Sequence, residues 1–134
     1  MKLALVAMTF RQDRLSGGYR ALKLAKYLDR AGCKMYLIGS DMPEEISTSM
    51  IKNIITIPYR TPIRRDLLVG RMINRLLLYP GPDRAWVKPV LASVLPIVRV
   101  HRPDAVIVSS PPHSIQMIGV ELARELSLPY FADL

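Results

Sequence analysis

The chain has 134 residues, half of them hydrophobic and 22% charged, which is the composition of one folded domain rather than of a disordered chain. Its single cysteine excludes an internal disulfide, and no apolar run approaches the ~20 residues that a membrane-spanning helix needs. The net charge is +8, and the segment 60–102 alone carries nine basic and two acidic residues, which favours an anionic partner such as phosphate, nucleic acid or acidic lipid. We expect a cytoplasmic protein and leave open a peripheral position on the inner face of the membrane.

The first apolar run, 2–8, does not alternate with polar residues and predicts a strand buried on both faces of a parallel sheet. After a polar loop, Gly17 and Gly18 open a helix over 19–30, in which apolar residues recur at helical spacing. Gly32 is expected to cap this helix. Further strands are predicted at 34–39 and 53–58.

The second half of the chain begins with two predicted helices, at 64–79 and 83–101, and Pro96 is expected to kink the second one. A strand at 105–108, a helix at 114–126 and a strand at 130–132 follow. The alternation of apolar strands and helices predicts an α/β fold with a Rossmann-like, doubly wound parallel sheet over 1–134.

Ligands of open α/β sheets bind at the carboxyl ends of the strands, which selects the loops 9–18 and 109–114 and the residues after Asp133. The pair Gly17 and Gly18 at a helix N-terminus favours a bound anion, although glycines there also permit a tight entry into the helix. The sequence has no Gly-x-Gly-x-x-Gly motif, which argues against a dinucleotide site.

Histidine and cysteine are too sparse and too scattered to indicate a metal site, and no nucleophile motif is present. His113, in the loop after the fourth strand, could bind a sugar hydroxyl or a phosphate or transfer a proton, or it could simply cap the next helix. His101 is expected at the surface, where it complements the dipole of a helix end.

The predicted helix 64–79 places Arg64, Arg71 and Arg75 on one side among apolar residues. This arrangement suits an anionic membrane interface or an anionic acceptor. It equally suits a helix that covers the sheet while its arginines reach into water. A nucleic-acid partner is less favoured, because the region has few aromatic residues and no recognition motif.

Four stretches of the chain resemble the N-terminal domain of family 4 glycosyltransferases, which have the GT-B fold: Met1–Val6, the glycine pair with Leu28–Gly32, Arg102–Ser114 and Leu128–Leu134. Such enzymes have two Rossmann-like domains that face each other across a cleft. The N-terminal domain binds the acceptor, and the C-terminal domain holds the nucleotide-sugar and carries a Glu-x7-Glu signature. No two glutamates here have that spacing, so we expect the donor-binding half to be missing from this chain.

The resemblance also implies a set of site residues. Gly17 and Gly18 would meet the donor phosphates or the acceptor when the cleft closes. Ser110 and Asp133 are further candidates for binding the acceptor or the donor phosphates. Arg20 is added for its position one turn into the helix, where it could bind an anionic acceptor, and not for a match to a family motif. Many family members carry a histidine directly after the fourth strand. Here Ser109 occupies that position and His113 lies four residues later, so these two residues are the catalytic candidates.

The sequence therefore predicts the acceptor-binding half of a retaining glycosyltransferase that moves a sugar from a nucleotide-sugar to a cell-surface polysaccharide or glycolipid precursor. The fragment alone is expected to be inactive. The expected partners are a nucleotide-sugar, a sugar or lipid-linked acceptor and the absent domain, with no nucleic acid, no metal and no cofactor. The alternative is a stand-alone Rossmann or flavodoxin-like binding or regulatory module.

Overall fold

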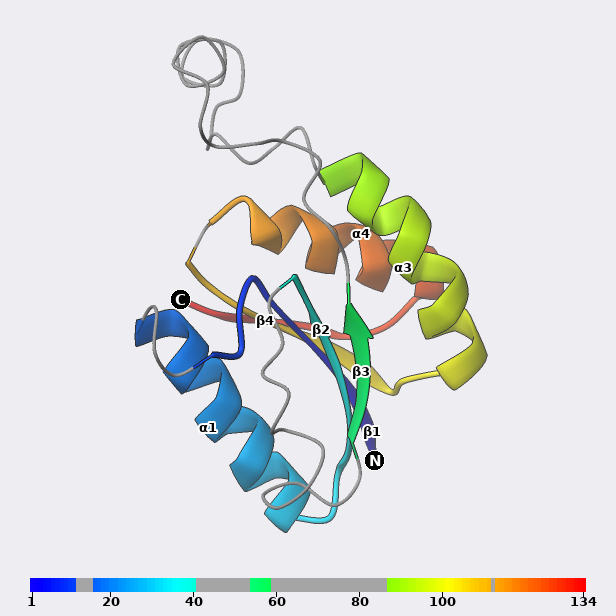
Figure 1. Cartoon of the computed structure of the whole chain (residues 1–134). Coiled ribbons are helices and arrows are strands. Elements are labelled where there is room, and N and C mark those ends of the chain that lie inside the picture. The colour runs from blue at the N-terminus through cyan, green and yellow to red at the C-terminus, as the bar shows by residue number, and fades with distance from the viewer. Residues whose placement is uncertain (12–15, 41–53, 59–86, 112) are drawn as a thin grey trace, which may run out of the picture.

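Five short apolar segments form one parallel sheet in the computed structural model, which describes residues 1–11, 16–40, 54–58, 87–111 and 113–134. The strands are β1 (Lys2–Ala7), β2 (Lys34–Gly39), β3 (Ile54–Pro58), β4 (Ala105–Ser109) and β5 (Tyr130–Asp133). All four strand pairs are parallel, and the order across the sheet is β3-β2-β1-β4-β5 (Figure 1). The predicted Rossmann-like, doubly wound parallel sheet is confirmed.

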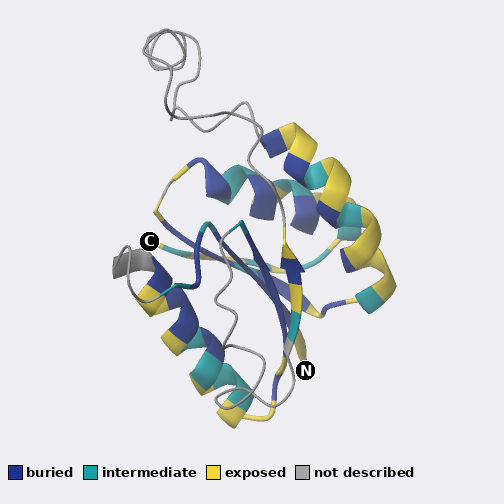
Figure 2. Cartoon of the chain, in the orientation of Figure 1, coloured by how far each residue is buried: buried dark blue, intermediate teal, exposed yellow. Residues whose placement is uncertain are grey.

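The helices that the structure describes cover the two faces of this sheet unequally. On one face lies α1 (Ser16–Arg30), and on the other lie α3 (Val87–His101) and α4 (Ile115–Leu126) (Figure 1). The central strand β1 is buried along nearly its whole length because helices pack on both of its sides (Figure 2). This double burial explains why its sequence does not alternate between apolar and polar residues.

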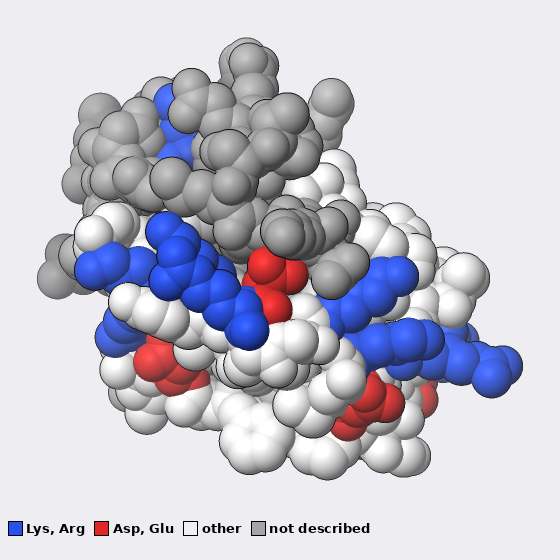
Figure 3. All heavy atoms as spheres, turned by 90° about the horizontal axis from the view of Figure 1, so that it is seen from below, with Lys and Arg blue, Asp and Glu red and all other residues white. Residues whose placement is uncertain are grey.

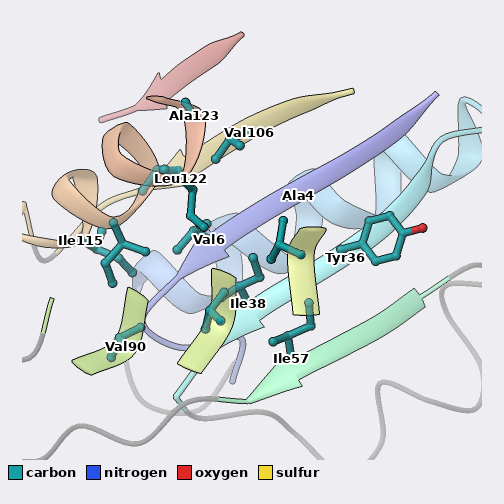
Figure 4. Packing of buried hydrophobic residues seen from close by; sticks show 14 of the residues in the cluster. Ala4, Val6, Tyr36, Ile38, Ile57, Val90, Val106, Ile115, Leu122 and Ala123 are labelled. Atoms are coloured by element: carbon teal, nitrogen blue, oxygen red, sulfur yellow. The ribbon is translucent and has the colours of Figure 1, made fainter. Parts of the chain in front are cut away.

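Two apolar clusters form the core, one on each face. The cluster under α1 includes Leu5 and Leu37, which are fully buried. The larger cluster lies under α3 and α4, where valines of α3 spaced three or four residues apart and Leu122 of α4 meet Val6 and Ile38 of the sheet (Figure 4). Each fully buried side chain of this size contributes roughly 1.5–3 kcal/mol to stability.

The bounds of α1 differ from the prediction in a way that matters for the site. The helix begins at Ser16, so Gly17 and Gly18 lie in its first turn and not before it. Its other end is as predicted: Gly32 has φ +85°, the N–H of Gly32 donates to the carbonyl of Asp29, and the N–H of Cys33 donates to that of Leu28. The left-handed backbone of Gly32 allows both of these bonds, which together end the helix.

The other described elements follow the predicted pattern with small shifts. The helix α3 is described from Val87, and Pro96 lies inside it. Both β4 and β5 extend one residue further than expected, to Ser109 and Asp133. The predicted helix 64–79 lies outside the described residues.

His101, the last residue of α3, is half-buried and not a free surface residue. Its ring stacks on that of Tyr36 in β2, with ring centroids 4.8 Å apart and an interplanar angle of 27°. Tyr36 is buried, so this contact fixes the end of α3 against the sheet. A position at the helix terminus is still compatible with the expected dipole interaction.

Candidate functional site

The order of the strands singles out one point on the carboxyl edge of the sheet. From β1 the chain winds in one direction to β2 and β3, and from β4 it winds in the other direction to β5. The loops that leave β1 and β4 therefore diverge, and ligands of such sheets bind at the point of divergence. Residues from the start of α1, the loop after β4 and the end of β5 contact one another there.

Arg20, in the second turn of α1, links these three segments. Its Nε lies 3.1 Å from Oδ2 of Asp133 at the end of β5. Its Nη1 donates to the carbonyl of Leu134 at 3.1 Å, and its Nη2 donates to the carbonyl of Ser110 in a short contact. A guanidinium has five N–H donors in a fixed plane, so after these three contacts with described residues two donors are left for a ligand.

The carboxylate of Asp133 is held from a second side by Ser109. The Ser109 hydroxyl, which is buried, donates to Oδ2 of Asp133 at 2.7 Å, and the N–H of Ser110 donates to the main-chain carbonyl of Asp133 at 2.9 Å. The contacts from Ser109 and from Arg20 therefore both end on Oδ2 of Asp133. Within the described part of the chain no hydrogen bond to Oδ1 competes with a ligand hydroxyl, and the Asp133 side chain is 31% exposed.

Two residues that the sequence did not single out position the loop after β4. Gln116, in the first turn of α4, donates from Nε2 to the hydroxyl of Ser110 at 2.6 Å. Its Oε1 accepts a short hydrogen bond from the hydroxyl of Tyr130 in β5. Burial raises the pKa of Tyr130, because the charged phenolate loses solvation. The tyrosine therefore stays a donor, and this in turn fixes which end of the Gln116 amide faces Ser110.

Of the glycine pair, Gly18 contributes to the site through packing. A Cβ on Gly18 would lie 2.4 Å from the carbonyl oxygen of Arg11 and 3.1 Å from Cγ2 of Thr9. The first turn of α1 therefore approaches the loop after β1 too closely for any side chain at this position. For Gly18 this contact agrees with the tight entry into the helix, and the anion-binding role of the pair stays a prediction.

The remaining candidates are less closely connected to this cluster. His113 is exposed in the turn before α4, and no hydrogen bond of its imidazole to another described residue is present. Ser114 occupies the cap position of α4 with its hydroxyl buried and without a hydrogen-bond partner among the described residues. Arg64, Arg71 and Arg75 lie outside the described residues.

The structure thus brings together four of the sequence-predicted site residues, from three separate segments of the chain: Arg20, Ser109, Ser110 and Asp133. It adds Gln116 and Tyr130 as supports. No group of histidine, cysteine and carboxylate side chains among the described residues could hold a metal ion. None of the helices in the described part of the chain is both long enough and apolar enough to cross a membrane.

Chemically, the cluster offers a partly exposed carboxylate beside a cation, supported by two buried serine hydroxyls. A carboxylate oxygen accepts from hydroxyl groups, and a guanidinium donates to oxyanions or to sugar oxygens. Because Arg20 already faces Asp133, much of its charge is balanced locally. The cluster is therefore better suited to a neutral polyhydroxylated group with one nearby anionic group than to a polyphosphate.

No protein-family model matches this chain, and no curated protein sequence matches it. Solved structures with the same fold include the C-terminal domain of a hydrogenase from Pyrococcus furiosus, at 14% identity and a TM-score of 0.59, where the match covers 99% of this chain and 90% of that one. They also include MurG of Acinetobacter baumannii, at 17% identity and a TM-score of 0.58, covering 98% of this chain and 35% of MurG. A UDP-glucosyltransferase from Polygonum tinctorium that can glucosylate indoxyl matches at 14% identity and a TM-score of 0.54.

These likenesses establish the Rossmann-like fold of the chain and its similarity to one domain of two glycosyltransferases. The chain spans 35% and 29% of the lengths of those two enzymes, and 90% of the hydrogenase domain.

Proposed function

We propose that this chain is the acceptor-binding half of a retaining glycosyltransferase that moves a sugar from a nucleotide-sugar to a cell-surface polysaccharide or glycolipid precursor. The observation that carries the proposal is the cluster of Arg20, Ser109 and Asp133 at the point where the winding of the sheet reverses. The fold similarity to MurG and to the UDP-glucosyltransferase supports it.

In this proposal Oδ1 of Asp133 accepts hydrogen bonds from acceptor hydroxyls, while Ser109 and Arg20 hold the carboxylate in place. The free N–H groups of Arg20 bind an anionic group of the acceptor or the leaving phosphate of the donor. Transition-state charge is stabilised by such fixed donors, without a metal ion or a protein nucleophile. His113 lies on the exposed rim, where it can contact either substrate.

Titration of the isotope-labelled chain with sugars, followed by NMR, tests the proposal. Neutral and phosphorylated disaccharides should shift the amide signals of Ser110 and Asp133. Asp133→Asn should weaken this binding about fivefold, since a charge-assisted hydrogen bond contributes roughly 1.5–3 kcal/mol before the exposure of the site reduces it. Glu121→Gln, which removes a half-buried carboxylate from α4, should leave the binding unchanged.

The second candidate is a stand-alone binding or regulatory module, and one observation favours it: the hydrogenase domain is matched over nearly its full length. The stand-alone module predicts that a nucleotide or flavin, added without any sugar, shifts the amide signals of Ser110 and Asp133, and that the disaccharides do not. That result would contradict the glycosyltransferase proposal.

Binding to an anionic membrane through Arg64, Arg71 and Arg75 is proposed from the sequence alone. Vesicles of acidic lipid should sediment with the protein, and added salt should weaken the association. If the triple change Arg64→Ser, Arg71→Ser, Arg75→Ser leaves sedimentation intact, these arginines have no such role.

A further inference from the structure

The outward face of α1 carries an unusual combination of side chains. At 100° per residue, five of them fall within about 100° of arc, opposite the buried face of the helix. These residues, which we call the α1 stripe, are Tyr19, Lys23, Lys26, Tyr27 and Arg30. The only acidic residue of α1, Asp29, falls outside this arc, so the stripe carries three positive charges and no negative one.

The two tyrosines of the stripe are far more exposed than rings of this size usually are. Tyr19 is 45% exposed and Tyr27 is 61% exposed. The ammonium of Lys23 lies 4.3 Å from the centre of the Tyr19 ring, so the cation is held over an aromatic face. Lysines alone would only make a solvated helix face, whereas exposed rings between them form a surface that can bind a ligand by both charge and stacking.

The stripe is continuous with the candidate site. Tyr19 precedes Arg20, whose guanidinium contacts Ser110 and Leu134 at the carboxyl edge of the sheet. From Tyr19 to Arg30 the helix runs about 16 Å away from that edge. Figure 3, which shows the molecule from below, shows Lys and Arg side chains on the side where α1 lies in Figure 1 and also on the opposite side, with acidic side chains near both groups.

We propose that the α1 stripe binds the extended chain of an acidic glycan, one that bears carboxylate groups, while the end of that chain occupies the candidate site. The inference rests on the proposed function and adds the class of acceptor. The lysines pair with carboxylates, and the tyrosine rings lie against the apolar faces of sugar rings while their hydroxyls bond to sugar hydroxyls. Such a subsite retains a growing chain between successive additions.

Two other occupants fit the same surface less well. A lipid surface requires aliphatic side chains among the cations, and the α1 stripe has none. A nucleic acid carries a phosphate at every residue and few hydroxyl groups, whereas the carboxylate of Asp133 beside the head of the stripe is an acceptor for hydroxyl groups. A glycan with carboxylates on some of its sugars can pair with the cations of the stripe, and the hydroxyls at its end can bond to the carboxylate of Asp133.

Calorimetric titration of the full chain with short linear polygalacturonate tests the proposal. The methyl-esterified form of the same polymer serves as the uncharged probe. We expect the acid form to bind and the ester to bind at least tenfold more weakly. Lys23→Gln combined with Lys26→Gln should weaken binding of the acid form about fivefold, which is what two exposed ion pairs contribute. Adding Tyr27→Ala to this variant should weaken binding of the acid form further, without changing how that binding depends on salt.

The matched control is Lys88→Gln combined with Arg124→Gln, which removes the same charge from exposed positions on α3 and α4. This control should bind nearly as tightly as the unchanged protein. Equal weakening in both double variants would overturn the proposal, because binding would then depend on net charge alone. The proposal would also be overturned if a single-stranded oligonucleotide or anionic vesicles bound as tightly as polygalacturonate or more tightly, and if the change of Lys23 and Lys26 to Gln abolished that binding.

Asp133→Asn separates this inference from the proposed function. If polygalacturonate binding depends on the stripe and not on Asp133, the stripe is a glycan subsite and the candidate site is wrong as the acceptor position. If binding depends on Asp133 and not on the stripe, the site stands and the inference about the stripe fails. Circular dichroism of each variant shows whether its fold is intact.

Discussion

The guanidinium of Arg20 and the carboxylate of Asp133, 3.1 Å apart, connect the first helix of the chain to its last strand. The two residues are far apart in sequence, and each makes further bonds: Arg20 to the carbonyls of Ser110 and Leu134, and Asp133 to the hydroxyl of Ser109. The pair therefore fixes the geometry of the candidate site more than it stabilises the fold. Both side chains are partly exposed, which screens their attraction.

Arg20→Gln should lower the free energy of unfolding by about 1 kcal/mol, because two main-chain carbonyls lose a charged donor along with the ion pair. Asp133→Asn should cost less, since an amide oxygen still accepts from Ser109. A double-mutant cycle measured by urea denaturation should give a coupling of about 0.5 kcal/mol. Arg30→Gln, at the exposed end of the same helix, is the control and should change little. A coupling near zero would mean that the pair does not form in solution.

Gly119→Ala should destabilise the protein by about 2 kcal/mol, although alanine favours helices by about 1 kcal/mol over glycine. The added Cβ would lie 2.0 Å from Cγ2 of Val108 and 2.8 Å from Cε2 of Tyr130, where α4 crosses the sheet. Thermal and urea unfolding measure the effect. Val120→Ala, at an exposed position of the same helix, should change stability by less than about 0.5 kcal/mol. A more stable Gly119→Ala variant would show that α4 sits further from the sheet.

Gly18→Ala should also destabilise the protein, because the added atom would lie 2.4 Å from a main-chain oxygen of Arg11, which cannot move aside as a flexible side chain can. We expect a loss of about 1–3 kcal/mol. The amide signals of Thr9 and Arg11 should shift in NMR spectra, since the loop after β1 must give way. Unchanged stability together with weaker sugar binding would instead assign Gly18 to ligand contact.

Tyr130 should make stability depend on pH in the alkaline range. Its pKa is raised above the ordinary 10.0 by burial, so the folded state holds its proton more tightly than the unfolded state does. This contribution is fully present below pH 10 and is lost as the pH rises through the folded pKa. Urea denaturation of the unchanged protein should therefore show a steeper fall above pH 10 than that of Tyr130→Phe. Identical slopes would contradict the shift.

The strands of the sheet could be predicted from sequence because parallel strands buried on both faces leave uninterrupted apolar runs, as in Leu3–Ala7. The end of α1 was predictable from Gly32, because a left-handed backbone favours glycine. The start of α1 was not predictable, since glycines in a first helical turn run against helix propensity. The close approach to the loop after β1 explains the glycine at position 18.

Some residues of the candidate site could likewise be predicted from the sequence, and others could not. The rule that ligands bind at the carboxyl edge led to Ser109 and Ser110, and family resemblance led to Asp133, but no local pattern marks Gln116 or Tyr130. Their importance arises from a contact between a helix and a strand that periodicity does not encode. Likewise, His101 looked like a surface residue because nothing near it in sequence indicates the stacked ring of Tyr36.

The pairing of β1 with β4 has a consequence for how the site comes into being. The two strands are neighbours in the sheet, and the N–H of Lys2 bonds to the carboxylate of Asp104 across 102 positions of sequence. Closing a loop of that length costs entropy before any contact offsets it, so this pairing belongs to the slow steps of folding. A species that has formed only the unit β1–α1–β2 already contains Arg20 but none of its partners. Ligand binding therefore reports on the completed topology, and a ligand that binds here holds α1 against the end of the last strand, across the 114 positions of sequence that separate Arg20 from Leu134.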